Sequence, residues 1–325
     1  PSCGFTENAR GGGARYEHDL TRGLEAAGDK IRTVTFPYRG TGRWPWASAF
    51  MVPTLMKAAT EAPFDLIRCH STSHLGLACL MAKRRFKYPL VTHVHHWEPR
   101  SAGLEKMILQ HSDRIVVDSP FVKGQHKALG ITTPIDVGWC GVKAPGLSGG
   151  PTAAGNPYAL TVGPLIERKH PLEIVKAWAQ VQKVPLYWIG DGPLLKEARV
   201  LTQKCGSPVS FLGSVSEQEK DALLSGATLF VFGGTLEGCP LAILEALAAG
   251  LPIVALDGGP IRDIVEGAGL MAVSWEHLAS TASMVLSHAP LRATMRTGAS
   301  LRWSERFTPA KFISRIREIY AKVLR

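Results

Sequence analysis

The chain of 325 residues is divided by one segment, residues 143–157, in which Gly, Pro, Ser and Ala predominate. Such a composition is typical of a linker. On each side of it, short apolar runs that suit buried strands alternate with runs that suit helices. This length suggests about two domains. The alternation predicts that each is a doubly wound α/β fold around a parallel sheet.

The expected boundaries follow from this pattern. An N-terminal Rossmann-like domain covers residues 1–143 and the linker covers 144–157. A second Rossmann-like domain covers 158–307, and an amphipathic helix follows at 308–325. Residues 1–10 are polar and turn-like, whereas a doubly wound domain normally opens with an apolar strand. We therefore expect a first strand to be missing from the N-terminal domain.

Composition narrows the class of protein without selecting a function. The six cysteines are scattered and form no C-x-x-C pair, which favours a reduced, cytoplasmic chain without disulfides or a zinc site. No apolar run that is free of charged residues and prolines is long enough to span a membrane. No signal peptide is visible. The net charge of +10 fits nucleic acid, anionic membrane or anionic small molecules, and equally a solvated surface.

Residues 235–250, T-L-E-G-C-P-L-A-I-L-E-A-L-A-A-G, place two carboxylates in an apolar run that follows a predicted strand. Pro240 suits the first turn of a helix, and Gly250 suits the position just past its end. Glu237 is therefore predicted in the loop at the carboxyl end of the strand. Glu245 is predicted about a turn and a half into the helix. Ligands of open α/β sheets bind in this crevice.

Two properties of this stretch indicate a binding site. The backbone N–H groups of Gly238, Cys239 and Leu241 would point out of the helix start, which favours an anion. Buried carboxylates are rare unless they are paired, and the apolar neighbours of Glu245 leave it little polar face. We expect hydroxyl groups of a ligand to serve as its partner. The alternative is an ordinary Glu on a solvated helix face.

The segment E-G-C-P-L-A-I-L-E resembles the E-x7-E motif of retaining glycosyltransferases with the GT-B fold, above all those of family 4. The resemblance implies two Rossmann-like domains facing a central cleft, with the terminal helix crossing back onto the first. It implies that Glu237 contacts the donor sugar and that Glu245 holds the ribose hydroxyls of the nucleotide. The intervening residues expected to border the donor are Gly238, Cys239, Pro240 and Leu241.

Residues 162–170, V-G-P-L-I-E-R-K-H, resemble the family segment V-G-R-L-x-x-x-K-G, in which basic residues neutralise the donor diphosphate. An arginine guanidinium can donate two parallel hydrogen bonds to phosphate oxygens, and a lysine ammonium adds a compact positive charge. Without the resemblance, a pair of solvated basic residues in a loop would be the simpler interpretation. Pro164 stands where the family has arginine, which leaves Arg168 and Lys169 as the expected carriers. Gly163 would border the donor.

Two further segments match the family. V-S-F-L-G, residues 209–213, resembles the strand whose backbone reads the base edge, which brings Leu212 into the donor site. R-G-G-G, residues 10–13, is a glycine loop that opens a predicted helix, and such a loop lets a phosphate or sugar approach the backbone. Glycine loops are also common turns. The resemblance assigns Gly12 and Gly13 to the loop between donor and acceptor.

Three histidines, at 93, 95 and 96, end a predicted strand in T-H-V-H-H-W. A metal site is disfavoured because His93 and His95 would share one side, His96 would not, and no acidic or cysteine cluster accompanies them. The resemblance implies a single His beside the donor sugar, with His95 as first choice and His96 as second. An imidazole there could bond to a sugar hydroxyl or to the acceptor.

An aromatic stretch, residues 44–56, fits either core packing or a flap that touches a lipid-linked acceptor or a membrane. A basic cluster could add attraction to anionic lipid at the inner face of the membrane, or could be a solvated helix end; it consists of Lys83, Arg84, Arg85 and Lys87.

Together these matches predict a retaining glycosyltransferase that moves a sugar from a nucleotide-diphosphate sugar to a saccharide, small-molecule or lipid-linked acceptor, without a metal or other cofactor. A sugar-nucleotide epimerase, a phosphorylase and a non-catalytic sugar-nucleotide-binding protein stay open as alternatives. Nucleic-acid binding would rest on net charge alone, and we expect no such partner.

Overall fold

The structure, a computed structural model, describes residues 2–3, 12–34, 47–61, 63–70, 72, 74–95, 102–146, 156–181, 184–235 and 237–324. The chain forms two compact units. Unit 1 consists of Pro1–Cys140 together with Pro309–Arg325, and unit 2 consists of Gly141–Thr308. Each unit is built around one parallel sheet.

Unit 1 holds a five-stranded sheet in the order β1-β2-β3-β4-β5. The strands are β1 (Ser2–Cys3), β2 (Ile67–Cys69), β3 (Leu90–Val94), β4 (Arg114–Val117) and β5 (Ile135–Val137). Its helices are α1 (Gly12–Ala26), α2 (Ala47–Glu61), α3 (His74–Phe86), α4 (Ala102–His111), α5 (Pro120–Ala128) and α13 (Pro309–Ala321).

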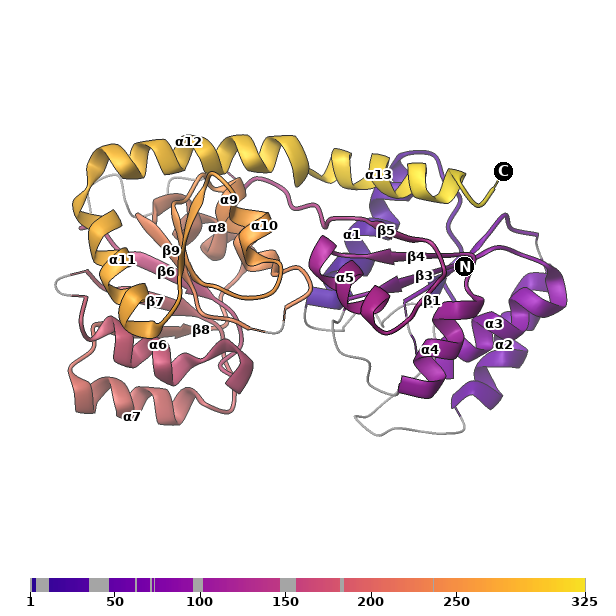
Figure 1. The fold of residues 1–325 in the computed structure, drawn as a ribbon, viewed down its shortest axis with the longest axis horizontal. Helices are drawn as coiled ribbons and strands as arrows, with labels where there is room; N and C mark the ends of the chain where they lie inside the picture. Colours follow the sequence, from indigo (N-terminus) through magenta and orange to yellow (C-terminus); the bar gives the residue numbers. More distant parts are fainter. Residues whose placement is uncertain are drawn as a thin grey trace. The chain divides into compact units, whose positions relative to one another are not determined.

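The helices of unit 1 cover both faces of its sheet (Figure 1), and side chains of β3 contact helices on each face in turn. Leu90 packs in an apolar cluster with residues of α2 and α3, and Val94 in one with residues of α4 and α5. His93 points to the opposite face, where it contacts α1 and α13. These two helices approach closely, since a Cβ on Gly23 would lie 2.3 Å from Ile313 Cδ1.

Some sequence-based expectations for unit 1 require correction. Gly12 and Gly13 are the first two residues of α1, and do not form a loop ahead of it. Ser2–Cys3 pair with β2 as an edge strand. Trp44, Trp46 and His96 lie outside the described residues.

Unit 2 holds a six-stranded sheet in the order β11-β10-β9-β6-β7-β8. The strands are β6 (Ala159–Val162), β7 (Leu186–Ile189), β8 (Val209–Gly213), β9 (Leu229–Phe232), β10 (Ile253–Leu256) and β11 (Gly269–Ala272). The helices are α6 (Pro171–Trp178), α7 (Leu195–Cys205), α8 (Glu217–Gly226), α9 (Leu241–Ala248), α10 (Ile261–Val265), α11 (Trp275–Ser287) and α12 (Ala289–Arg306), with a 3-10 turn η1 (Glu167–Lys169).

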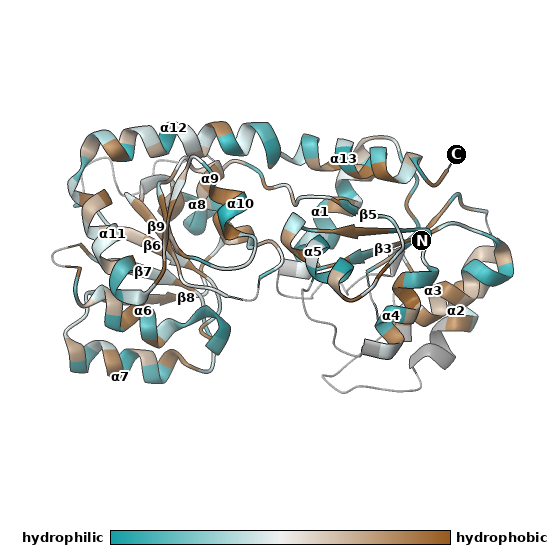
Figure 2. Ribbon diagram, viewed as in Figure 1, coloured by the Kyte–Doolittle hydropathy of each residue, from teal (hydrophilic) through white to brown (hydrophobic). Residues whose placement is uncertain are grey.

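The core of unit 2 lies on both faces of this sheet. One apolar cluster joins the strands to α6, α7 and α11 and includes the buried rings of Trp178 and Trp188. On the other face α9 packs against α12. The strands are mostly brown (hydrophobic) in Figure 2, whereas α7 and α12 carry polar residues on their outer sides. A parallel sheet covered on both faces has near-continuous apolar strands, as observed.

Local signals read from the sequence set several helix ends. Ser119 Oγ accepts a hydrogen bond from Val122 N at the start of α5. Ser216 and Glu219 form a complete capping box at the start of α8. Gly250, with φ of 65°, follows the end of α9 in the left-handed conformation that glycine tolerates. The predicted position of Gly250, just past the end of a helix, is confirmed.

The chain that enters unit 2 is bonded to that unit before β6 begins. Val142 N donates to Phe307 O at 2.9 Å, and Trp303 Nε1 donates to Val142 O at 3.0 Å. Gly146 N donates to Asp221 Oδ2 at 3.2 Å. Residues 147–155 of the expected linker lie outside the described part of the chain.

Among the described residues, no helix combines the length and apolar character needed to cross a bilayer.

Candidate functional site

The order of strands in unit 2 reverses beside β6, which pairs with β7 on one side and with β9 on the other. The carboxyl ends of two strands that flank such a switch point form a crevice in which ligands of open α/β sheets bind. The segment after β6 carries Arg168 and Lys169 in η1, and the segment after β9 carries Glu237. The structure thus brings three predicted site residues to the switch point.

Lys169 and Glu237 form an ion pair, with 2.9 Å between Nζ and Oε1. Their side chains are 11% and 13% exposed, whereas that of Arg168, at 3.9 Å from the same oxygen, is 50% exposed. Lys169 Nζ also lies 4.8 Å from the centre of the Phe232 ring, a cation–π contact. Burial lowers the pKa of Lys169, and the charge of Glu237 offsets only part of that effect.

The backbone on both sides of the switch point is closely packed. A Cβ on Gly190, which follows β7, would lie 2.1 Å from the carbonyl oxygen of Gly163, which follows β6. Thr235 N, after β9, donates to Arg168 O at 2.9 Å. A Cβ on Gly163 would lie 3.4 Å from Lys169 Cε. The ends of β6 and β9 therefore border the Lys169 side chain, at Gly163 and at Phe232.

Glu245 is buried in α9, with 6% of its surface exposed. Its Oε1 accepts a hydrogen bond from Lys220 Nζ of α8 at 2.8 Å, and Lys220 also pairs with Glu217 at 2.9 Å. The expectation that Glu245 needs a partner is correct, but the structure supplies a protein partner where we expected hydroxyl groups of a ligand. Lys220 was not recognised from the sequence.

The other predicted donor residues fall at several places in unit 2. Gly238 and Pro240 are buried and Cys239 is a half-buried free thiol. Leu241 is the first residue of α9, so Pro240 lies one position earlier than predicted. Leu212 is 39% exposed on β8, which is separated from β6 by β7.

His95 follows β3 in unit 1 and is held by Asp118, which follows β4. Its Nδ1 lies 2.9 and 3.0 Å from the two oxygens of Asp118. The ring packs edge-on against Tyr16 of α1, with 4.3 Å between centroids. Burial lowers the pKa of His95, but the charge of Asp118 and its hydrogen bond more than offset this, so the pKa is raised overall.

His93 belongs to a separate hydrogen-bonded set. Its Nδ1 lies 3.1 Å from Tyr16 Oη and its Nε2 lies 3.0 Å from Tyr320 Oη of α13. Burial, followed by the neighbouring His70, lowers its pKa well below the usual range. With both nitrogens occupied, His93 ties α1 and α13 to the sheet.

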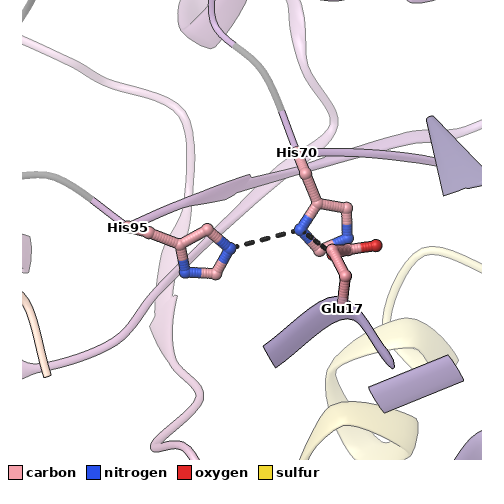
Figure 3. A group of neighbouring side chains, drawn as sticks. All are labelled: Glu17, His70 and His95. Atoms are coloured by element: carbon pink, nitrogen blue, oxygen red, sulfur yellow. Dashed lines mark hydrogen bonds and ion pairs between the residues drawn. The ribbon is translucent and has the colours of Figure 1, made fainter. Parts of the chain in front are cut away.

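Two further polar residues lie beside His95 (Figure 3). His70 follows β2, and its Nδ1 is 3.2 Å from His95 Nε2. The same Nδ1 is in direct contact with Glu17 Oε1 of α1. The side chains of Glu17 and His70 are 7% and 1% exposed. Gly12 and Gly13 lie on the same helix as Glu17, one turn earlier.

Two family models match the chain, one in each part. The model described as Glycosyltransferase Family 4 matches residues 10–144, and the model described as Glycosyl transferases group 1 matches residues 150–301. The chain belongs to the group 1 glycosyltransferases.

A curated relative of this glycosyltransferase is the sulfoquinovosyl transferase SQD2 of Arabidopsis thaliana, 32% identical over 112 residues, which are 34% of this chain and 21% of the relative. The match therefore spans about a fifth of that protein. Among solved structures, sucrose-phosphate synthase from Thermosynechococcus elongatus has a TM-score of 0.82 at 20% identity over 96% of this chain and 94% of its own. HepE from Anabaena, solved with UDP and glucose, has a TM-score of 0.79 at 18% identity over 99% of each chain. These likenesses confirm the GT-B fold of this glycosyltransferase.

The polar residues of this glycosyltransferase that sequence reasoning missed share one recognisable position. His70, His95 and Asp118 directly follow the strands β2, β3 and β4. The carboxyl ends of parallel strands lie at one edge of a sheet, so polar residues there are candidates for one cluster. Glu17 has a weaker signal, because a charged residue between Tyr16 and His18 also fits a solvated helix face.

Proposed function

We propose that this glycosyltransferase moves a sugar from a nucleotide-diphosphate sugar to an acceptor with retention of anomeric configuration. The observation that carries the proposal is the Lys169–Glu237 ion pair at the switch point of unit 2, with the more exposed Arg168 beside it. This arrangement supports donor binding by unit 2.

In this proposal, Arg168 and Lys169 bind the donor diphosphate. Negative charge develops on that group as the sugar leaves, and charge-assisted contacts that strengthen with it lower the barrier. Arg168 has half of its side chain exposed, so its guanidinium can turn toward a ligand. Two protein cations supply the neutralisation, so this role needs no metal.

Glu237 would contact the donor sugar and Glu245 the ribose. Lys220 Nζ donates to one oxygen of Glu245 and fixes the carboxylate, whose oxygens can accept hydrogen bonds from ribose hydroxyls. The UDP and glucose in the HepE structure, together with the shared fold, support a nucleotide-sugar donor.

Unit 1 would receive the acceptor, a saccharide, a small molecule or a lipid-linked sugar. His95, oriented by Asp118, would bond to a sugar or acceptor hydroxyl, and Gly12 and Gly13 would leave room near the start of α1. We propose a cytoplasmic location, because no disulfide joins Cys69, Cys79, Cys140, Cys205 or Cys239. Peripheral contact with anionic lipid would use the basic last turn of α3.

A thermal-shift series with UDP, GDP, ADP and dTDP and their sugar conjugates tests the donor class. A ligand at 100 times its Kd stabilises the native state by about 2.7 kcal/mol. We expect one nucleotide to raise the Tm, and the shift to disappear in Glu245→Ala. The control is Glu197→Ala, an exposed carboxylate on α7. No shift with any nucleotide, or an equal shift in Glu245→Ala, would contradict the proposal.

A further inference from the structure

His170 lies between η1 and α6 in a backbone conformation that is uncommon for a residue with a side chain. Its φ and ψ are both 50°, in the left-handed region. Its N–H donates to Glu167 O at 2.8 Å and closes η1, and its carbonyl accepts from Ile174 N at 3.0 Å at the start of α6. Such conformations cost energy outside glycine and persist where the surrounding structure over-determines them. The turn from η1 into α6 therefore fixes the direction of the His170 side chain.

The imidazole of His170 reaches the segment that follows β9. Its Nε2 lies 2.9 Å from Thr235 Oγ1, in a hydrogen bond that joins residues 65 positions apart. The ring also packs against Trp275 of α11, with 5.5 Å between the ring centroids. Trp275 borders the same segment, because a Cβ on Gly233 would lie 2.9 Å from its Cη2. His170 thus contacts the segment after β9 directly, and through Trp275.

The His170–Thr235 bond is one of three contacts that join this segment to η1. In the second, Thr235 N donates to Arg168 O at 2.9 Å. The third is the ion pair between Lys169 Nζ and Glu237 Oε1, at 2.9 Å. Both sequence neighbours of Lys169 therefore hold Thr235, which lies two positions before Glu237.

The two residues that precede Thr235 explain why it is the point of attachment. Gly233 and Gly234 have no side chains, and a Cβ on Gly234 would lie 3.2 Å from Lys169 Cδ. The chain can pass close to Lys169 only because these positions are glycine, and Thr235 is the first residue after β9 that offers a side chain. A glycine at position 170 would adopt the left-handed conformation without strain. It would, however, lack the imidazole that holds Thr235.

We propose that His170 is a positioning residue of the donor site. Through Thr235 it holds the segment that carries Glu237 against η1, and so maintains the spacing between Glu237 and Lys169. This role rests on the proposed function, in which those two residues contact the donor sugar and its diphosphate. Binding groups that are held in place before a ligand arrives need not be ordered when it binds, and this improves affinity.

The first test uses the ion pair itself and needs no nucleotide. Urea denaturation of the full chain with Glu237→Gln, Lys169→Met and both changes measures the coupling between these side chains. We expect the coupling to shrink when the same changes are made together with Thr235→Val, because valine has a similar shape but no hydroxyl. In Thr235→Ser, which keeps the hydroxyl, the coupling should be retained. An unchanged coupling in Thr235→Val overturns the proposal.

The second test is isothermal titration of the full chain with UDP, GDP, ADP and dTDP. For the nucleotide that binds most tightly, we expect Thr235→Val and His170→Asn each to raise the Kd by about two- to tenfold, the effect of one lost hydrogen bond. Asparagine tolerates the left-handed conformation, but its amide ends one atom nearer the backbone than the Nε2 of histidine. The double variant should bind no more weakly than the weaker single variant, because both changes remove the same contact.

Glu173→Gln is the matched control. Its carboxylate lies 3.9 Å from the other ring nitrogen of His170 and its side chain is 40% exposed, so the Kd should stay unchanged. Additive losses in the double variant, or an unchanged Kd in both single variants, overturn the proposal.

Failure of this inference is distinguishable from failure of the proposed function. If no nucleotide binds the unmodified chain, the proposed function fails, and the ion-pair coupling still decides whether Thr235 positions Glu237. If a nucleotide binds and Arg168→Ala weakens it, whereas Thr235→Val and His170→Asn do not, the proposed function stands and the role of His170 is overturned.

Discussion

Lys169 and Glu237 form a 2.9 Å ion pair although they follow two different strands of the unit 2 sheet. Each side chain is mostly enclosed, so removing one partner leaves an uncompensated charge. We expect Glu237→Gln and Lys169→Met each to lower the free energy of unfolding by about 2 kcal/mol, less than the roughly 3–5 kcal/mol of a fully buried pair. Urea denaturation measures this. The double variant should recover part of the loss, and strictly additive effects would contradict the pairing.

Arg168 offers the cleanest test of diphosphate binding, because half of its side chain is exposed and little packing depends on it. Arg168→Ala removes a charge-assisted contact of about 1.5–3 kcal/mol, which corresponds to a roughly ten- to hundredfold loss of kcat/KM. Its Tm should stay unchanged. Arg199→Ala, an exposed arginine on α7, is the control. Turnover at the unmodified level would remove Arg168 from the site.

Lys220 is the protein partner of the buried Glu245, at 2.8 Å. Lys220→Met leaves the Glu245 carboxylate buried without a cation. We expect the free energy of unfolding to fall by roughly 3 kcal/mol and nucleotide binding to weaken. Glu217→Ala serves as the control. It removes the partner whose side chain is 74% exposed, and an exposed pair contributes about 1 kcal/mol or less. Equal stability of the two variants would show that the Lys220–Glu245 contact is unimportant.

Asp136 gives unit 1 a specific dependence on pH. Burial raises the pKa of its carboxyl. Hydrogen bonds from Lys322 and Arg114 lower the pKa by more than burial raises it, so the pKa is depressed overall. Stability from this group is therefore present above the unfolded pKa of about 3.9 and is lost as pH falls through the folded value. The Tm gap between the unmodified chain and Asp136→Asn should be constant at neutral pH and shrink below about pH 4. The exposed Asp65→Asn is the control; a gap that widens in acid would contradict the assignment.

Much of unit 2 could be predicted because its signals are local. The strand β7 (Leu186–Ile189) ends where its apolar run meets Gly190. Gly250 and the Ser216 capping box are likewise signals within one turn of chain. Such features depend on neighbours in sequence, which an amino-acid pattern records directly.

The errors concern features that depend on distant residues. The apolar surroundings of Glu245 indicated a buried carboxylate, but its partner Lys220 lies 25 positions away. Glu17, His70 and Asp118 meet His95 through the fold of unit 1, and the sequence signals only that His70 and Asp118 each follow a strand.

The helix α13 has a consequence for how the protein is made. It follows all of unit 2 in the chain, yet it packs in unit 1, where Tyr320 bonds His93 and Ile313 fills the space above Gly23. During synthesis, the sheet of unit 1 leaves the ribosome first but has to wait for this helix, while unit 2 emerges in one uninterrupted piece. Unit 1 therefore starts to emerge before unit 2, but it is completed only after unit 2 has been synthesised.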